Sequence, residues 1–329
     1  RGMVVIKGKR PPEPDHGASE TFTEFEDDYA DGLDEEDEDL SSPKSRSSAS
    51  SKNEKKKKVG KKVDPELKKL TLLHGAHYKA MDESIAQKPT TMHSIGETKI
   101  PKLVEKSEEN ASLWREYNRN HMTRTYPAGS RVDSSNYTPI LAWAMGCQLV
   151  ALNFQTPDSN LSLNDGLFRQ AGQCGYLPKP ASLMGGEKPK KTELKITVLG
   201  ARCIPKPKGA KTGELIDPYV QVDLHDVRLG TNNIEEHVKE DFETPPLDNN
   251  GFNPVWKKGA FFKFEVHSRD VAMIHFRIVD KDLGKDDKIA SSSIPISCLR
   301  KGYRSIQLYD HNNTRTGPFN SSVLFVKIE

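Results

Sequence analysis

The spacing of apolar residues changes near residue 190, and this change divides the chain into two kinds of fold. Between residues 64 and 183, short apolar runs such as Leu70-Thr-Leu-Leu73 and Cys147-Gln-Leu-Val-Ala-Leu152 alternate with helical stretches and with loops rich in Pro, Gly and Asn. Such runs are typical of strands that are buried on both faces of a parallel sheet. The pattern predicts half of a (β/α) barrel, a fold whose functional residues lie on the loops after the strands.

After residue 193, apolar residues fall on every second position, as in Leu194, Ile196 and Val198. Runs of period two that are separated by turn-rich loops indicate an antiparallel sandwich with one face of each strand turned inward. The fold class is therefore α/β followed by all-β. We expect the half-barrel at residues 63–184, a linker at 185–192 and the sandwich at 193–329.

A third region, residues 11–62, has low complexity: an acidic block, a serine block and a lysine block follow one another. Dense like charge and few aromatic residues bury too little apolar area to offset an ordering entropy of about 1–2 kcal/mol per residue. We expect a disordered linker, and composition alone supports no role beyond a tether. Before it, residues 1–10 contain one expected strand that ends in Lys7-Gly-Lys9.

Composition excludes several classes of function. The formal net charge of the 329 residues is +2, so no overall basic field favours nucleic acid as a partner. The 4 cysteines are widely spaced without a Cys-x-x-Cys pair, which argues against a zinc or disulfide framework and fits a reducing compartment. No run approaches the roughly 18 uncharged apolar residues of a membrane span. Because the chain opens on Arg1 within an expected strand, without Met or a signal peptide, we expect a fragment of a longer protein.

Three motifs lie in the half-barrel region in this order: Arg-Thr-Tyr-Pro-Ala-Gly-Ser-Arg at 124–131, Gly-Cys-Gln-Leu-Val-Ala-Leu-Asn-Phe-Gln-Thr at 146–156, and Gly-Gln-Cys-Gly-Tyr at 172–176. Their order, spacing and residue types resemble the Y half of the catalytic barrel of eukaryotic, delta-like phosphoinositide-specific phospholipases C. The resemblance implies the C-terminal half of a (β/α)8, TIM-like barrel. It also implies calcium-dependent hydrolysis of phosphatidylinositol 4,5-bisphosphate to inositol 1,4,5-trisphosphate and diacylglycerol.

Arg124 and Tyr126 are two positions apart, so their side chains point to the same side of an extended segment. An arginine fork matches a phosphate and an aromatic face packs on a sugar-like ring, although spacing alone equally allows a structural pair. The resemblance implies that Arg124 contacts a ring phosphate and that Tyr126 stacks on the inositol. It further implies that Ser94 hydrogen-bonds the headgroup, in a segment that departs from the family's Ser-Phe-Ser-Glu pattern, and that Lys7 and Lys9 neutralise ring phosphates.

The resemblance places the two catalytic histidines and the catalytic calcium ligands in the X half of the same barrel, upstream of Arg1. We therefore expect no catalytic residue in this chain. Its own half-barrel histidines (His74, His77, His93 and His121) show no ligand or dyad spacing, and a carboxylate near Arg131, as in Asp133, is interpreted as a structural partner. Residues 11–62 correspond to the X-Y linker, which covers the active site in relatives, and negative charge there is repelled by anionic lipid.

The sandwich carries three markers: Ile-Asp-Pro-Tyr-Val at 216–220, Asn-Asn-Gly-Phe-Asn-Pro-Val-Trp at 249–256, and Asp280-Lys-Asp282 with Asp287 further on. They resemble the C2 domain, a calcium- and lipid-binding module. Calcium prefers six to eight oxygen ligands. The implied set is the carboxylates of Asp217, Asp280, Asp282 and Asp287 with a carbonyl from the Asn249 loop, and the alternative is solvated turn carboxylates.

One departure from the C2 pattern lies in the first loop, residues 204–211, which carries lysines where many calcium-binding relatives carry an aspartate. One ligand is then missing unless Glu214 replaces it, and Lys206, Lys208 and Lys211 can contact anionic lipid directly. The expected location is cytoplasmic, peripheral to the inner face of the plasma membrane. The alternative function is a catalytically inactive membrane-binding scaffold that keeps the Y and C2 modules.

Overall fold

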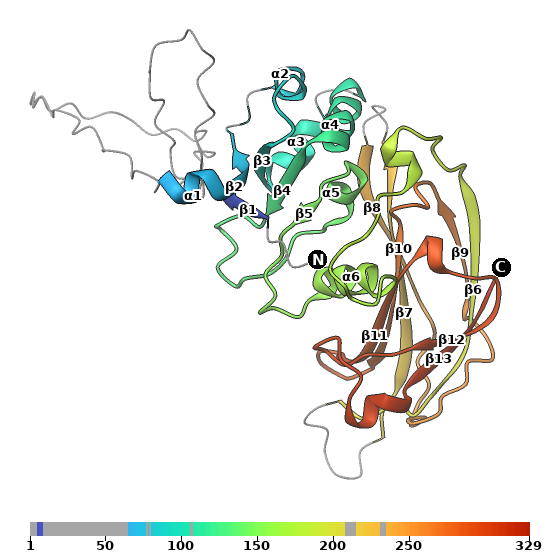
Figure 1. Cartoon of the computed structure of the whole chain (residues 1–329). Helices are drawn as coiled ribbons and strands as arrows, with labels where there is room; N and C mark the ends of the chain where they lie inside the picture. Colours follow the sequence, from blue (N-terminus) through green and yellow to red (C-terminus); the bar gives the residue numbers. More distant parts are fainter. Residues whose placement is uncertain are drawn as a thin grey trace, which may run out of the picture.

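The computed structural model describes residues 5–8, 65–76, 78, 80–105, 108–207, 215–230 and 235–329. These residues form an α/β part followed by a β-sandwich that packs beside it (Figure 1). The expected linker at 11–62 and most of the expected X-half strand lie outside the described residues.

The α/β part is a curled half-barrel sheet in which every neighbouring pair of strands is parallel. Its order is β1 (Ile6–Gly8), β2 (Thr71–Gly75), β3 (Thr91–Gly96), β4 (Met122–Tyr126) and β5 (Leu149–Val150). Helices accompany the strands: α1 (Pro65–Leu70), α2 (Met81–Ile85), α3 (Lys99–Glu105), α4 (Glu108–Asn120), α5 (Ile140–Ala144) and α6 (Ser159–Arg169), with a 3-10 turn at Ala181–Met184. This arrangement confirms the predicted half-barrel. Among the described helices, the longest has 13 residues, and none has the length and apolarity of a membrane-crossing helix.

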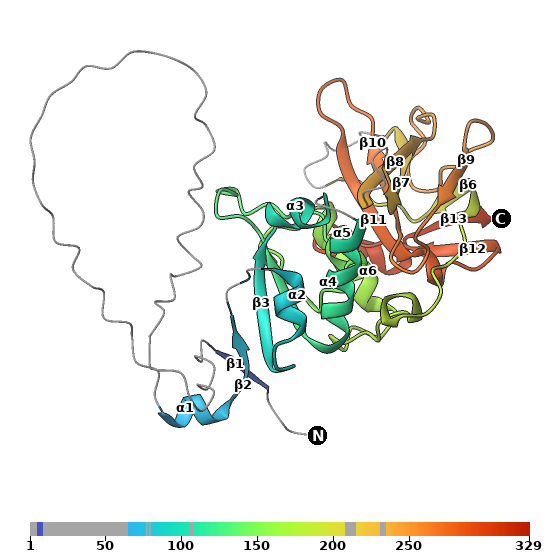
Figure 2. The same cartoon turned by 90° about the horizontal axis from the view of Figure 1, so that it is seen from above.

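The two faces of this sheet are unequally buried in β4. In β4, Thr123 and Thr125 are buried, whereas Arg124 and Tyr126 are half-buried. The buried face packs against α2 and α4, which lie on the same side of β3 (Figure 2). The expectation of strands buried on both faces was wrong: Leu72 in β2 is 52% exposed. The physical reason is that the described contacts of α2 and α4 with this sheet are made at β3, for example at His93, and leave Leu72 of β2 uncovered.

The sandwich consists of two four-stranded antiparallel sheets, which confirms the all-β prediction. The first sheet contains, in spatial order, β11 (Asp287–Pro295), β10 (Met273–Asp280), β7 (Pro218–Leu229) and β8 (Glu235–Glu243). The second contains β12 (Gly302–Gln307), β13 (Val323–Ile328), β6 (Thr192–Arg202) and β9 (Phe261–Val266), and 3-10 turns lie at Ile296–Cys298 and Gly317–Ser321. The alternating residues meet between the sheets, where Ile196, Val222, Phe264 and Phe276 are buried.

The outer face of the first sheet packs against the half-barrel, so β7 is buried on both faces. Val227 and Met273, from β7 and β10, share one apolar cluster with Ile140 and Trp143 of α5. Helix α6 lies on β11 at Gly166, where an added Cβ atom would come within 2.4 Å of the Ser293 carbonyl oxygen. The half-barrel and the sandwich therefore meet through a tightly packed junction rather than through the linker alone.

Candidate functional site

Strand pairing brings four of the five predicted headgroup residues together on the accessible face of the half-barrel. Ser94 in β3 is the Cα partner of Arg124 in β4, and Gly96 is the partner of Tyr126. The Lys7 ammonium, on β1, donates a hydrogen bond of 3.3 Å to Ser94 Oγ. Lys9, the fifth residue, lies outside the described residues. Residues separated by more than a hundred positions in the chain thus line one surface.

The Arg124 guanidinium lies over the Tyr126 ring, with 5.0 Å between the guanidinium carbon and the ring centre. This is a cation–π distance, and it fixes the direction of the arginine fork. The Tyr126 ring lies against Gly96, where the nearest ring atoms are 3.6 Å from the position of an added Cβ atom. Two cations, a hydroxyl group and an aromatic face therefore share one surface, a combination that suits a phosphorylated polyol ring.

The half-barrel histidines that the structure describes serve the opposite, helix-covered face. His93 is buried between Tyr78 and Tyr117, and its ring nitrogens lie 2.9 Å from the Ala76 carbonyl oxygen and 2.9 Å from Ser84 Oγ. His121 stacks on Tyr117 and bonds the Gln87 carbonyl group. Within the described part of the accessible face, recognition groups are present without an imidazole pair for acid–base chemistry.

The loop after Tyr126 is held by Glu97, which the sequence interpretation missed. Arg131 Nε and Nη2 donate to the two carboxylate oxygens of Glu97 at 2.5 and 2.7 Å, and the Ala128 N–H donates to the same carboxylate at 2.7 Å. This bonding raises the pKa of the Arg131 guanidinium. The interpretation of Asp133 as the partner of Arg131 is corrected, since Asp133 is exposed and accepts from the Ser135 N–H at 3.1 Å. The available signal was that Glu97 directly follows β3, at the same sheet edge.

Polar side chains in the next two loops have a structural role. Asn136 receives a bond from the Asn153 N–H at 2.6 Å and donates its own N–H to Asp158 at 2.8 Å. Asp158 also caps α6 by accepting from the Leu161 N–H at 2.9 Å. The loop after β4 is thereby tied to the loop after β5 and to the start of α6. The accessible face is thus framed by loops that are hydrogen-bonded to one another.

Strand pairing also gathers the predicted calcium residues at one end of the sandwich. Asp280, at the end of β10, is the Cα partner of Asp287, at the start of β11. The Asp217 N–H donates to Asp280 Oδ1 at 2.7 Å, and the Asn249 N–H donates to Asp217 Oδ1 at 2.6 Å. The three marker motifs of the sandwich therefore meet, and backbone donors already engage two of their carboxylates.

Asp286, which sequence interpretation missed, organises the third loop. Its carboxylate accepts bonds from Tyr219 Oη at 2.8 Å, from Lys281 Nζ at 3.0 Å and from the Asp282 N–H at 3.1 Å. The Tyr219 bond is the main reason that the pKa of Asp286 is lowered. A signal was available in the sequence, because Asp286 precedes the predicted ligand Asp287 directly and Tyr219 belongs to the Asp-Pro-Tyr motif.

The donor atoms at this end suit calcium in kind, because they are carboxylate and backbone oxygens. Their spacing does not yet form a compact cage. Within the described ranges, the only three carboxylate, imidazole or thiol groups whose ligand atoms all lie within 4.8 Å of one another are Asp223, His225 and His275, in another part of the sandwich. Lys208, Lys211 and Glu214, from the first loop, lie outside the described residues.

Comparison with known proteins places both parts in described families. Residues 67–182 match the family described as "Phosphatidylinositol-specific phospholipase C, Y domain", and residues 192–311 match the C2 domain. A 1-phosphatidylinositol 4,5-bisphosphate phosphodiesterase of Dictyostelium discoideum is 36% identical over 277 residues, which cover 80% of this chain and 33% of that protein. The delta-3 enzyme of that name from Homo sapiens is 33% identical and is matched over 34% of its length.

The fold comparison agrees. The crystal structure of PLC21 from L. pealei aligns with a TM-score of 0.67 at 26% identity, covering 82% of this chain and 34% of that chain. PLC21 from S. officinalis aligns with a TM-score of 0.66 and the same identity. The chain thus spans about a third of the length of the relatives that it matches.

Proposed function

We propose that this chain, which belongs to the phosphoinositide-specific phospholipase C family, supplies the headgroup-binding half of an enzyme. The proposed enzyme hydrolyses phosphatidylinositol 4,5-bisphosphate to inositol 1,4,5-trisphosphate and diacylglycerol. The observation that carries the proposal is the grouping of Lys7, Ser94, Arg124 and Tyr126 on one accessible face. In this proposal residues 1–10 end the X region, 11–62 form the X-Y linker, 63–184 form the Y region, 185–192 link it to the sandwich, and 193–329 form the C2 domain.

Each residue of the face has a distinct role in this proposal. Arg124 and Lys7, with Lys9, neutralise the ring phosphates, and Ser94 hydrogen-bonds the headgroup. Tyr126 packs on the apolar face of the inositol ring while it directs the Arg124 fork. A hydrogen bond to a charged group contributes about 1.5–3 kcal/mol, so these contacts select for phosphorylated rings.

The chemistry at the phosphodiester needs groups from a second half-barrel. Attack by a ring hydroxyl group on the phosphorus requires a base for the hydroxyl proton, an acid for the leaving oxygen, and positive charge at the phosphoryl oxygens. The described half-barrel face offers positive charge and positioning. We propose that the X half of the same barrel supplies the acid–base histidines and the catalytic calcium site.

The sandwich is proposed to dock the enzyme on an anionic membrane at the cytoplasmic, inner face of the plasma membrane. Large apolar side chains stand exposed beside its three marker motifs: Leu215 is 57% exposed, Phe252 is 60% exposed, and Leu283 is fully exposed. Calcium bound by Asp217, Asp280, Asp282 and Asp287, with an Asn249-loop carbonyl, would cancel the negative charge at this end. The exposed Lys206 offers a calcium-independent contact with the same lipid.

Reconstitution tests the proposal. The 329-residue chain alone is expected to release no inositol trisphosphate from vesicles that contain phosphatidylinositol 4,5-bisphosphate, and co-expression with an X half-barrel from a relative is expected to produce calcium-dependent release. Release by the chain alone would contradict the assigned division of labour. An inactive complex that forms stably and still binds the vesicles would favour the membrane-binding scaffold instead.

A further inference from the structure

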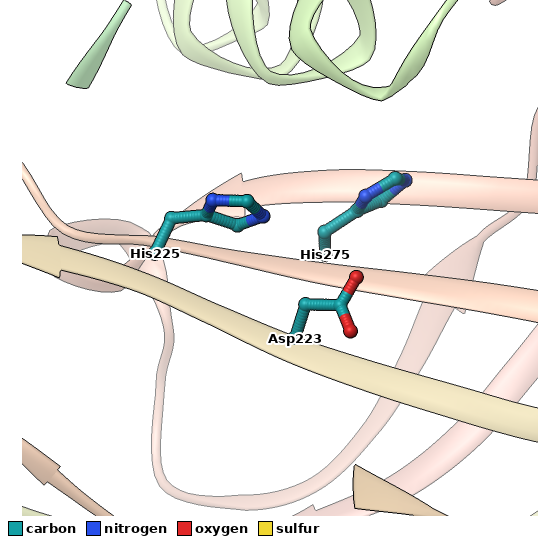
Figure 3. Close-up of side chains that lie close together, drawn as sticks. All are labelled: Asp223, His225 and His275. Carbon is teal, nitrogen blue, oxygen red and sulfur yellow. The ribbon is translucent and has the colours of Figure 1, made fainter. Parts of the chain in front are cut away.

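Three buried side chains of metal-binding type lie together on the outer face of the first C2 sheet (Figure 3). Asp223 and His225 are two positions apart on β7 and so share a face, and His275 on β10 is the Cα partner of Asp223. Their exposed fractions are 1%, 5% and 0%. One ligand atom from each lies within 4.8 Å of the other two. In Figure 3 the three side chains rise from neighbouring strands toward the side where a half-barrel helix lies.

The cluster holds several polar atoms without hydrogen-bond partners among the described residues. They are both ring nitrogens of His275, Nε2 of His225 and Oδ1 of Asp223, and all are inaccessible to solvent. A buried polar atom without a partner destabilises the folded state, because it has lost its hydration. An ion bound between these atoms would use the ring lone pairs that the protein leaves unused, and it would replace Lys239 as the ion-pair partner of Asp223 Oδ1.

A second histidine orients one of the rings. His225 Nδ1 lies 3.2 Å from His237 Nε2, and the two rings stack with centres 5.4 Å apart. If Nδ1 carries the proton, the lone pair of Nε2 remains free, which is the arrangement that outer-sphere partners impose on metal-ligating histidines. A neutral imidazole with a free ring lone pair is the form that coordinates metals.

Nearby positively charged side chains oppose a bound divalent cation, so at least one of them must move away before the ion can bind. Arg277 donates a hydrogen bond to Oδ2 of Asp223, so the other carboxylate oxygen, Oδ1, is the one that can face an ion. Lys239 Nζ lies 3.4 Å from Oδ1, but its side chain is 40% exposed and its ammonium also lies 3.7 Å from Asp241. Lys239 can therefore turn outward to Asp241. Lys288 is a further cation whose charge acts on His275, so it also opposes a bound ion.

We propose that Asp223, His225 and His275 bind one Zn²⁺ ion, which displaces Lys239 from the Asp223 carboxylate. Two imidazole nitrogens and one carboxylate oxygen form a ligand set typical of zinc, whereas calcium prefers oxygen ligands alone. The site uses no cysteine, so the cysteine spacing does not bear on it. An ion there would join β7 to β10 on the sheet face that packs against the half-barrel. Its ligand set would differ from the all-oxygen set at the loop end of the sandwich.

Zinc titration of the full 329-residue chain tests this proposal. Chain freed of metal with a chelator is titrated with Zn²⁺ against a chromophoric competitor, and Co²⁺ is added separately to record the visible absorption of a tetrahedral site. One equivalent of Zn²⁺ is expected to bind, and His275→Ala is expected to weaken that binding by at least tenfold. The matched control His311→Ala, at an exposed histidine, should leave the affinity unchanged.

The Lys239→Gln variant distinguishes a zinc site from a buried polar cluster that binds no metal. Because the lysine competes with the ion, its removal is expected to tighten Zn²⁺ binding severalfold, and the substitution lies at a half-exposed position that does not threaten folding. Absence of a stoichiometric site in the parent chain would overturn the proposal. Equal affinity in the parent chain and in folded His275→Ala, or unchanged or weaker binding in Lys239→Gln, would also overturn it. Calcium at the same concentration should not compete.

Discussion

Arg131 and Glu97 form a two-point pair, with Nε and Nη2 donating at 2.5 and 2.7 Å to the two carboxylate oxygens. The pair connects the end of β3 to the loop that follows Tyr126. We expect Glu97→Gln to lower turnover of phosphatidylinositol 4,5-bisphosphate in the reconstituted enzyme, because losing a charged hydrogen bond costs about 1.5–3 kcal/mol and frees the loop. Steady-state rates on vesicles measure the effect. Asp133→Asn, an exposed neighbour of Arg131, is the control and should keep the parent rate.

Arg124→Ala is expected to reduce turnover of phosphatidylinositol 4,5-bisphosphate more than turnover of unphosphorylated phosphatidylinositol. The lost contact is worth about 1.5–3 kcal/mol only where its ring phosphate exists. Tyr126→Leu provides the comparison: loss of ring stacking should slow turnover of both lipids, and loss of the ring that directs Arg124 should add a smaller loss on the bisphosphate alone. Equal losses on both lipids for Arg124→Ala would mean that the arginine is structural.

Deletion of residues 11–62 is expected to raise activity on anionic vesicles. The acidic block at 20–39 is repelled by a negative lipid surface, and this repulsion reaches further when salt is low because the Debye length grows. Activity should therefore be compared at several ionic strengths. A rate that is the same with and without the segment at every salt concentration would reduce it to a tether.

Calcium-dependent vesicle binding by the full chain is expected to disappear in the double variant Asp280→Asn with Asp282→Asn. The ion cancels the repulsion among these carboxylates and attracts anionic lipid, so removing two charges removes its site. Sedimentation with phosphatidylserine vesicles, in calcium and in chelator, measures binding. If binding ignores calcium and falls when Lys206, Lys208 and Lys211 are neutralised, the sandwich docks through its lysines.

Gly166→Ala is expected to lower the melting temperature of the whole chain. Its Cβ atom would come within 2.4 Å of the Ser293 carbonyl oxygen, and overpacking of this kind costs about 1–3 kcal/mol. That cost exceeds the roughly 0.5–1 kcal/mol that alanine normally contributes over glycine within a helix. Gly284→Ala is the control, because no atom lies within 4 Å of its added Cβ. A higher melting temperature for Gly166→Ala would show that α6 does not pack tightly on β11.

Local sequence patterns predicted the two folds, because strand spacing is a local property, whereas the headgroup residues from Lys7 to Tyr126 were expected from the family resemblance and not from spacing. The local patterns did not predict what covers each strand. In β7, Val222 and Leu224 belong to the core between the sheets and Asp223 and His225 lie on the opposite side of the strand, yet all four are buried. The half-barrel covers that outer side, and no periodicity within β7 reports a contact with residues more than fifty positions away. The Glu97 partner of Arg131 was missed although Glu97 directly follows β3, at the sheet edge where the loop after β4 also begins.

The apolar cluster that Val227 and Met273 share with α5 has a consequence for how the protein meets a surface. Because the two parts are packed on each other, the sandwich loops and the half-barrel face behave as two arms of a bivalent ligand with a short, stiff spacer. Once one arm is held, the other samples the surface at a raised effective concentration rather than from bulk solution. Weak individual contacts at the loops and at Arg124 then combine into avidity, and loosening the junction would lose that gain without altering either contact.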